Sequence, residues 1–588
     1  MLIPTLQSRL HAAVTAVLPD AGLERVLLRP CGNPAHGDYE TTALMSLAKE
    51  RRLNPRQLAT DVLARLDARD LCEEVSISGA GFLNFRLRAE ALGAAVAGAA
   101  RGEHLFFSRV AAPRTVVIDF SSPNVAKPLH VGHIRSTFLG DCLARVFRLL
   151  GHRVITDNHL GDWGTQFGML LVGWKTLLDR AALERDPIAE MERLYKEVHA
   201  RCQADPPTRE LARAELVRLQ AGDATNLDIW REMQRLSQAQ FDAIYARLGV
   251  AFDHTLGESF YNPRLGSVVD ALLAAGLARE SEGAIGIFSD GTLPPKEDPI
   301  LIHRDGGWQP NPFLVRKSDG GFNYATTDLA TLEYRLATWA PDEILYVTDG
   351  RQQLHFRQLF AAFRRWHPGL RARLEHVWFG SILGEDGKPF KTRSGDTVKL
   401  ADLLDEAEER ALRIVTGKNP DLPPEETREI ARRVGIGALK YADLLPNRQS
   451  DYVFSWEKLL ALNGNTAPYL QYAYTRTRSL QRKGGELPSA AALPPALPIA
   501  TPEELGLARH LVNFGFTLDA VAADYRPNFL CNYLYDLAGR FSQFWENCPV
   551  LKAEDPAVRA SRAALCDVTG RVLEQGLRLL GIETLERM

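Results

Sequence analysis

Two histidines that stand three residues apart, His130 and His133 in the run PLHVGHIRS, are the first candidates for chemistry in this chain. Residues at that spacing project from one face of a helix. As donors, the imidazoles could follow charge that moves onto phosphate oxygens. Gly132 has no side chain, so a purine or a phosphate can approach the backbone between them. Lys127 adds a fixed positive charge just before the pair.

The elements on either side of these histidines predict how they are held. Residues 115–120, TVVIDF, are nearly all apolar and rich in β-branched side chains, the pattern of a strand buried on both faces of a parallel sheet. Prolines 123 and 128 break that strand and predict a loop. Apolar residues then recur at helical spacing, so we expect a helix that begins within 130–133 and ends at Gly151. The positive end of this helix would face the loop and stabilise an anion.

Each of these features also has an ordinary structural explanation. A bare H-x-x-H is a weak motif, because two histidines on a helix are more often surface or half-buried residues than ligands. A zinc site is not expected, since no cysteine or third ligand lies at suitable spacing nearby. The seven cysteines are scattered from Cys31 to Cys566 without C-x-x-C pairs, so we expect reduced, mostly buried thiols and no metal.

Length and composition limit the class of protein. A chain of 588 residues is too long for one core and predicts about three or four domains. With 45% apolar and 24% charged residues it has an ordinary globular composition, with no apolar run near the roughly 20 residues that span a bilayer. The start of the chain lacks a signal-peptide pattern, so we expect a cytoplasmic protein without a membrane partner. The net charge of −3 gives no overall reason to expect nucleic acid, although a local basic face is compatible with it.

The longer strings resemble one family. SSPNVAKPLHVGHIRSTFLGD resembles the "HIGH" signature region of class I aminoacyl-tRNA synthetases, in the version found in the arginyl-tRNA synthetases. NHLGDWGTQFG at 158–168 is a close match to the same family. The resemblance implies an enzyme that activates L-arginine with ATP to arginyl-adenylate and transfers arginine to the 3′ end of tRNA(Arg), releasing pyrophosphate and AMP.

The resemblance also implies a multidomain fold of the α/β and all-α classes. We expect an α+β N-terminal additional domain over 1–110 that contacts the corner of the tRNA, although it could equally be just a packed module. A class I, Rossmann-type parallel-sheet catalytic domain should cover 111–400, with a connective insertion at about 175–300. A C-terminal helical anticodon-binding bundle should cover 401–588. Sequence periodicity predicts helices at 6–18, 55–66, 400–415, 425–445, 465–480, 505–522, 529–545 and 560–580, an alternating strand pair within 75–87, strands at 153–157, 284–288 and 342–348, and an extended connector at 484–502.

The arginine pocket is expected in the second half of the catalytic domain. There Phe313 to Lys317 should return the chain to the sheet, before a helix that begins at Thr326. Asp328 would often be a helix-capping carboxylate. A planar, permanently charged guanidinium needs carboxylates in fork geometry, however, and the YATTD run at 324–328 resembles the family's arginine pocket. The resemblance implies that arginine binds to Asp328, Asp119, Ser121, Asn124, Tyr324 and Gln352, whereas the role of Glu258 stays open.

The mobile "KMSKS" loop of the family has a degenerate counterpart here. A last strand at 374–383 should run into GEDGKPFKTRSG, which lacks the consensus Met and Ser. The resemblance implies that Lys388, Lys391 and Arg393 bind ATP together with His130, His133 and Gly132. The implied catalytic set is His130, His133, Lys127 and Lys391, with Lys391 as the main cation and Lys127 compensating for the degenerate loop. We expect Mg²⁺ to accompany ATP and the enzyme to be a monomer.

Two other functions fit parts of the chain. One is a catalytically inactive tRNA-binding paralogue, against which the intact HVGH argues. The other is a class I enzyme for another amino acid, such as the cysteinyl relative, whose pocket uses a zinc thiolate site and cysteines that this chain lacks.

Overall fold

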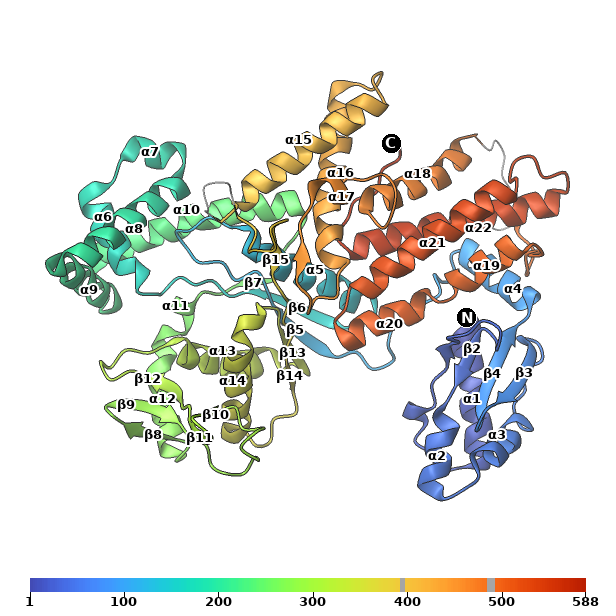
Figure 1. Ribbon diagram of the computed structural model, residues 1–588, viewed down its shortest axis with the longest axis horizontal. Coiled ribbons are helices and arrows are strands. Elements are labelled where there is room, and N and C mark those ends of the chain that lie inside the picture. The colour runs from blue at the N-terminus through green and yellow to red at the C-terminus, as the bar shows by residue number, and fades with distance from the viewer. Residues whose placement is uncertain (392–396, 484–491, 588) are drawn as a thin grey trace. The chain divides into compact units, whose positions relative to one another are not determined.

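The computed structural model describes residues 1–391, 397–483 and 492–587, and they divide into two compact units (Figure 1). The sheet unit consists of Val110–Arg410 and Ala442–Trp456. The helical unit consists of Met1–Arg109, Ala411–Tyr441 and Glu457–Met588. Arg393 of the expected ATP site lies outside the described residues.

A five-stranded parallel sheet forms the centre of the sheet unit, in the order β14, β13, β5, β6, β7. The strands are β14 (Arg373–His376), β13 (Glu343–Tyr346), β5 (Thr115–Asp119), β6 (Arg153–Asn158) and β7 (His254–Thr255). Val117 of β5 is fully buried and aligns with Ile155 on one side and Ile344 on the other. The predicted parallel sheet is confirmed, and the apolar segment forms its middle strand.

The helix that follows β5 begins and ends where the sequence predicts. A single turn, η2 (Val131–His133), leads into α5 (Ile134–Leu149). Gly151 has a φ of +95°, a conformation in which glycine avoids the Cβ penalty, and it follows the last helical turn. β6 then lies parallel to β5, which completes a β–α–β unit.

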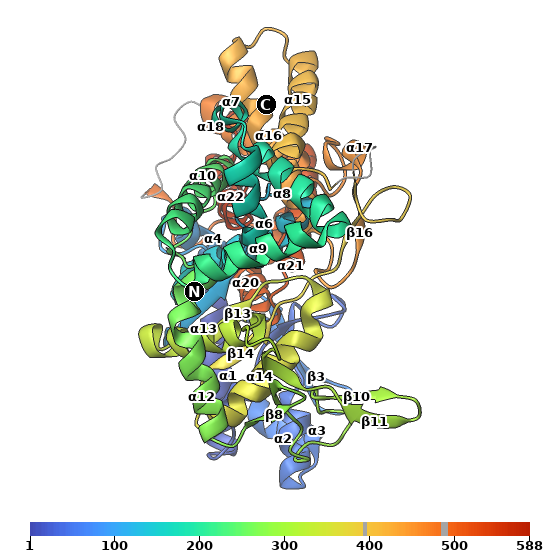
Figure 2. The same cartoon turned by 90° about the vertical axis from the view of Figure 1, so that its left-hand side faces the viewer.

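The insertion between the two halves of the sheet is helical and then forms a small antiparallel sheet. Its helices and the single turn η3 are α6 (Gln166–Leu177), α7 (Arg180–Arg185), α8 (Pro187–Ala204), α9 (Pro206–Gln220), α10 (Ala224–Leu248), α11 (Glu258–Tyr261), η3 (Asn262–Arg264) and α12 (Leu265–Ala274). Strands β8 (Ala278–Ser281), β9 (Ala284–Ile287) and β12 (Phe313–Arg316) pair in the order β12, β9, β8. The hairpin of β10 (Leu301–Arg304) and β11 (Gly307–Pro310) projects beside them (Figure 2).

Two expectations in this region are wrong. The strand at 313–317 does not rejoin the parallel sheet: it pairs antiparallel with β9, and Phe313 and Val315 bury one of its faces only. The next helix, α13 (Tyr324–Trp339), begins two residues before Thr326, since the side chain of Asn323 caps it by accepting from the Ala325 amide at 3.1 Å. The turn η4 (Gly350–Gln352) and α14 (Gln353–Trp366) follow β13.

The expected last strand at 374–383 is also not continuous. It divides into β14 and β15 (Ile382–Leu383), and β15 pairs with β16 (Tyr452–Val453) instead of with the central sheet. The break lies at Gly380, whose amide donates to the Arg448 carbonyl at 2.9 Å. A Cβ on Gly380 would lie 2.7 Å from the carbonyl carbon of Ser450, so the chain turns where two backbones approach closely.

The N-terminal part of the helical unit contains a four-stranded antiparallel sheet in the order β1, β2, β4, β3. The elements are α1 (Leu2–Val17), η1 (Leu23–Arg25), β1 (Arg29–Pro30), β2 (Tyr39–Thr41), α2 (Ala43–Arg51), α3 (Pro55–Leu63), β3 (Cys72–Ser78), β4 (Phe82–Leu87) and α4 (Ala89–Ala100). Helices at the first two predicted positions and the strand pair within 75–87 are confirmed.

The C-terminal part is helical, as predicted. Its elements are α15 (Leu400–Lys418), α16 (Pro424–Leu444), α17 (Trp456–Leu459), α18 (Ala467–Lys483), α19 (Pro502–Leu511), α20 (Phe514–Asp524), α21 (Asn528–Asn547) and α22 (Pro556–Leu579). One helix was expected at 505–522, but the chain breaks at Asn513, whose Oδ1 accepts from the Tyr39 hydroxyl at 2.6 Å. Of the expected connector, 484–491 lie outside the described residues and 493–501 form no helix.

Among the described helices, none combines the length and the apolar character that crossing a bilayer requires.

Candidate functional site

The loop between β5 and α5 has an unusual backbone. Ser121, Ser122 and Ala126 have φ values of +73°, +49° and +62°, a region that residues with a Cβ rarely adopt. Each of their amides donates to a specific side chain: Ser136 at 2.8 Å, Asn158 at 3.0 Å and Ser237 at 2.9 Å, respectively. Strain of this kind persists only where the surroundings over-determine it, and it clusters at functional sites.

Backbone hydrogen bonds fix the tautomers of the two histidines at the start of α5. His130 Nδ1 accepts from the Gly132 amide at 3.0 Å, and His133 Nδ1 accepts from the His130 amide at 3.1 Å. An amide can only donate, so in the neutral rings both protons lie on Nε2. Burial lowers the pKa of His133 to about 3, and burial with the Lys127 charge lowers the pKa of His130. At neutral pH both residues are therefore uncharged donors.

A cleft of about 320 Å³ opens at the N-terminal end of α5. The residues that line it come from the histidine turn, from η4, from the segment after β14 and from the loop after β15: His130, Val131, Gly132, Arg135, Asp349, Arg351, Phe379, Gly380, Ser381, Ile382, Pro389, Phe390, Lys391 and Thr397. The residues that follow the degenerate loop are hydrogen-bonded to the segment just before α5: the Val131 amide donates to the Val398 carbonyl, and the Leu400 amide donates to the Leu129 carbonyl. The structure thus brings together the two expected ATP-binding motifs.

The expected cations are placed differently from one another. Lys391 lies on the cleft and pairs across the loop with Thr397. Lys388 is exposed beside the turn of the same loop and is not among the lining residues. Lys127 points to the insertion, with Nζ 5.1 Å from the centre of the Tyr195 ring on α8. This geometry is a cation–π contact, which holds the ammonium group in place.

The acidic group of the expected arginine pocket lies at the start of α13. Asp328 Oδ2 is 2.6 Å from His355 Nε2 on α14, and the Tyr324 ring meets the His355 ring edge to face with centres 4.7 Å apart. Tyr324 is 64% exposed, which suits a residue that forms the wall of an open pocket. Gln352 and Asn124 are also exposed.

Two other expected arginine ligands already have partners inside the protein. Asp119 is buried, with Oδ2 2.6 Å from Arg335 Nη2 and Oδ1 accepting from Ser122 Oγ at 3.0 Å. Arg335 also holds Asp157, at the end of the neighbouring strand β6. Ser121 points inward, where its Oγ lies 2.7 Å from the Tyr245 hydroxyl.

Sequence reasoning left unassigned a half-buried acidic group, Glu258, whose charge interacts with that of Asp328. Burial raises the pKa of the Glu258 carboxyl, the charge of His159 opposes this, and the charges of Asp162 and Asp328 raise it further. Asp162 accepts from Ser259 Oγ at 2.7 Å. His159 Nδ1 is buried without a hydrogen-bond partner in the described part of the protein. The string NHLGDWGTQFG, which contains His159 and Asp162, was the signal that could have marked this group.

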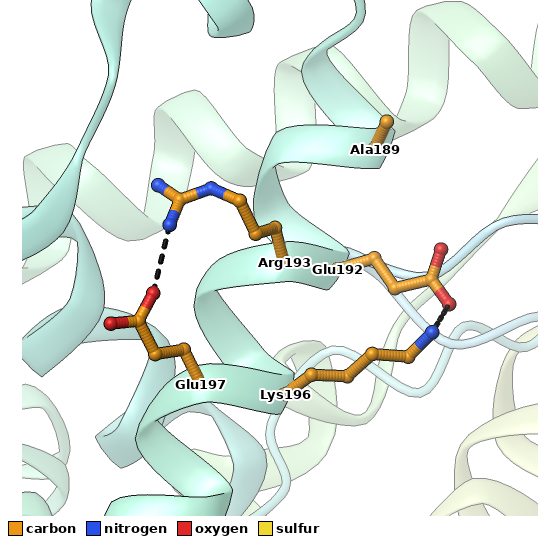
Figure 3. A pocket seen from close by; sticks show the side chains of 5 residues that line it. All are labelled: Ala189, Glu192, Arg193, Lys196 and Glu197. Carbon is orange, nitrogen blue, oxygen red and sulfur yellow. Dashed lines mark hydrogen bonds and ion pairs between the residues drawn. The ribbon is translucent and has the colours of Figure 1, made fainter.

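A second hollow lies along α8 and is lined by Ala189, Glu192, Arg193, Lys196 and Glu197 (Figure 3). Its charged side chains pair along one helix face, Arg193 with Glu197 at 2.9 Å and Lys196 with Glu192 at 2.8 Å. Such pairs at helical spacing describe a solvated face rather than a binding site. Within the described residues, no group of three or more metal-ligating side chains is found.

Family models match three consecutive parts of the chain. The arginyl-tRNA synthetase N-terminal domain matches residues 4–87, the catalytic domain of "tRNA synthetases class I (R)" matches 101–456, and the DALR anticodon binding domain matches 470–588. With the parallel sheet and the cleft at its helix mouth, these matches define a class I aminoacyl-tRNA synthetase.

Relatives specify the member of that class. An arginine–tRNA ligase of Synechococcus sp. is 45% identical over 592 residues, and the match covers 99% of this chain and 99% of the relative. An arginine–tRNA ligase of Hahella chejuensis is 44% identical over 595 residues, and the match covers 99% of this chain and 100% of the relative. The Thermus thermophilus arginyl-tRNA synthetase structure superposes with a TM-score of 0.82 at 27% identity, covering 100% of both chains. The chain belongs to the arginyl-tRNA synthetase family, and its activity is that of an arginine–tRNA ligase that uses ATP.

Proposed function

We propose that ATP binds in the cleft between the histidine turn and Lys391, and that arginine lies beside it with its guanidinium near Asp328. The arginine carboxylate attacks the α-phosphorus of ATP in line, and pyrophosphate leaves. The 2′-hydroxyl of the terminal adenosine of tRNA(Arg) then attacks the arginyl carbonyl carbon, and AMP leaves. The observation that carries this proposal is the cleft that His130 and Gly132 share with Lys391 of the degenerate loop, at the start of the helix where both histidines have their donor on Nε2.

The chemistry needs no covalent nucleophile, so positioning and charge stabilisation account for the rate. His130 and His133 donate through Nε2 to the phosphates, and exposed Gly132 leaves room for the nucleotide. Lys391 faces the leaving pyrophosphate, with Lys388 and Arg393 on the same loop and Lys127 on the histidine side. Removal of one such donor typically costs about 100-fold to 1000-fold in rate.

The guanidinium site combines two carboxylates, Asp328 beside His355 and Glu258 near His159. Asp328 and Glu258 lie within electrostatic reach, and burial raises the pKa of Glu258, so an arginine cation would stabilise both ionised carboxylates. Tyr324 forms the wall, and Gln352 and Asn124 hold the polar groups of the amino acid. Because both Asp119 oxygens already accept hydrogen bonds, Asp119 and Ser121 contribute through the loop that they support.

Mg²⁺ enters as part of the substrate MgATP. Asp349, the carboxylate that lines the cleft, is paired with Arg351 at 2.8 Å, so the ATP phosphates rather than the protein hold the ion.

The remaining parts of the chain contact tRNA. Residues 1–110 contact its corner and 401–588 bind its anticodon, where arginines interleave with aromatic rings, as in the Arg476 guanidinium 4.8 Å from the centre of the exposed Tyr472 ring. Residues 111–400 carry the catalysis. The enzyme works as a monomer in the cytoplasm.

Asp328→Asn tests the pocket. Loss of a charge-assisted hydrogen bond of about 1.5–3 kcal/mol should raise the KM for arginine about 10-fold to 100-fold and leave the KM for ATP unchanged. Steady-state aminoacylation with arginine and ATP varied in turn measures both values.

Glu333→Gln is the matched control, because Glu333 forms a second carboxylate–histidine pair between α13 and the end of α14, with His367 at 3.6 Å. This variant should keep the wild-type KM for arginine. An Asp328→Asn enzyme with an unchanged KM for arginine would remove Asp328 from the pocket.

The inactive tRNA-binding paralogue is tested by ATP–pyrophosphate exchange in the presence of arginine and tRNA. Exchange is expected, and its absence in the wild-type protein would favour the paralogue.

A further inference from the structure

The guanidinium of Arg135 lies at the base of the cleft and contacts three segments of the sheet unit. Arg135 follows the histidine turn in α5, is 1% exposed and lines the cleft. Its Nη1 donates to the Gly380 carbonyl at 2.9 Å and to the Ser450 carbonyl at 3.0 Å. Its Nε lies 3.3 Å from Asp443 Oδ1. One side chain therefore joins the helix of the histidines to the segment before β15, to the segment before β16 and to α16.

Two aromatic rings and a third hydrogen bond complete this cluster. The Arg135 guanidinium carbon lies 5.7 Å from the centre of the Phe379 ring and 5.2 Å from that of Tyr452. The Tyr452 hydroxyl donates to Asp443 Oδ1 at 3.2 Å. Asp443 is completely buried, so its charge is balanced inside the protein by Arg135.

The segments that Arg135 holds are the base of the degenerate loop. The Tyr452 amide donates to the Ser381 carbonyl at 3.1 Å, and the Phe454 amide to the Leu383 carbonyl at 2.8 Å. Further along the loop, the Phe390 ring stacks on the Phe454 ring with centres 4.6 Å apart. Lys391 comes next in the chain, so the contact between Phe390 and Phe454 fixes the backbone position from which the Lys391 side chain extends.

We propose that Arg135 and Asp443 are positioning residues for adenylate formation, because they set the distance between the histidine turn of α5 and the loop that carries Lys391. This inference rests on the proposed function of the cleft. A role in stability alone explains the pair poorly. Arg135 Nη2 and Asp443 Oδ2 are buried without hydrogen-bond partners in the described residues, and an incompletely satisfied buried pair adds little net stability.

The experiment measures ATP–pyrophosphate exchange in the full-length protein. Arg135→Lys keeps the charge but places all its donors on one nitrogen, so it cannot hold the two carbonyls at Nη1 and the carboxylate at Nε in their present positions. We expect kcat to fall about 10-fold to 100-fold, with the KM for arginine within about 2-fold of the wild type, because the arginine pocket is intact. An unchanged kcat would overturn the inference.

Glu343→Gln provides the matched control within the same unit. Glu343 is a buried carboxylate at the start of β13, at the amino-terminal end of the parallel strands, and lies 3.0 Å from Arg114. Its replacement should lower the unfolding temperature and leave kcat unchanged. A fall in kcat equal to that of Arg135→Lys would show that any lost buried ion pair has this effect, and would overturn the inference.

The double variant Arg135→Met/Asp443→Leu separates stability from position. Apolar residues of similar volume often replace a buried ion pair without loss of stability, so the unfolding temperature should stay near the wild-type value. The kcat should stay at least about 10-fold below wild type, and its recovery together with stability would overturn the inference. Should this variant fail to fold, Asp443→Asn, which keeps the shape and an acceptor for Tyr452, is expected to lower kcat in the same way. Failure of the wild-type enzyme to exchange would instead refute the proposed function.

Discussion

At the scale of residues, the histidines of the HVGH turn are neutral and carry their protons on Nε2, because backbone amides donate to both Nδ1 atoms. The pKa of His133, lowered to about 3, also makes folding sensitive to acid. The lowered value means that the stability of the buried neutral ring is fully present above about pH 6.5, the unfolded pKa, and is lost as the pH falls toward 3. No change of charge on this ring accompanies catalysis at neutral pH.

Replacement of His130 by glutamine and by asparagine tests the assignment of its proton to Nε2. In His130→Gln the amide nitrogen can take the place of Nε2, whereas in His130→Asn it falls near Nδ1. We expect the Gln variant to keep ATP–pyrophosphate exchange within about 10-fold of wild type and the Asn variant to lose about 100-fold to 1000-fold in kcat. His130→Ala gives the baseline without a donor. A more active Asn variant would place the working proton on Nδ1.

At the scale of elements, the helix of the histidines reaches its position because a glycine lets it approach the strand before it. A Cβ on Gly140 of α5 would overlap the side chain of Phe120, the residue that follows β5. Helix and strand also bury apolar side chains completely, such as Leu143 of α5 and Ile118, which shares the face of the strand with Phe120. The close contact determines how far the helix mouth projects over the edge of the sheet.

Gly140→Ala should therefore destabilise the sheet unit by about 1–3 kcal/mol through overpacking, although alanine favours a helix. The displaced helix should also lower kcat. Gly266→Ala in α12 is the control, since a Cβ there meets nothing within 4 Å and should be neutral or stabilise by up to about 1 kcal/mol. Thermal unfolding of both variants measures the difference. Equal unfolding temperatures would show that α5 does not need this contact.

At the scale of the whole molecule, the first 109 residues belong to the same compact unit as the C-terminal helices. Asp38 lies 3.0 Å from Arg509, and the Arg571 guanidinium donates to the Ala99 carbonyl at 2.6 Å. The Phe106 carbonyl packs against Gly515, where a Cβ would lie 2.6 Å away. The N-terminal module therefore supports the helices of the anticodon-binding part directly.

Removal of residues 1–109 should loosen the C-terminal helices and spare the catalytic sheet. In the chain 110–588 we expect amide hydrogen exchange in α19, α20 and α22 to quicken at least about 10-fold, because their covered faces become exposed. Exchange in α5 of the same protein is the internal reference and should not change. Unaltered exchange in the C-terminal helices would show that they are stable without the module.

The sequence by itself determined the features that depend on neighbouring residues. The apolar run of β5, the helical spacing of α5 and the intact HVGH string are local patterns, so strand, helix and candidate donors followed from them. The family strings carried the rest of the identification, because a string such as NHLGDWGTQFG is too specific for a chance match.

The tertiary structure alone decided which distant residues meet. The strand expected at 374–383 breaks at Gly380 because the backbone of Ser450 approaches it there, and Asp119 turns from the pocket toward Arg335. Arg135 and Asp443 are 308 positions apart, and neither lies in a pattern that points to the other. Periodicity reports which face of an element is buried, whereas the partner of a buried charge is set by packing between elements, which no local pattern encodes.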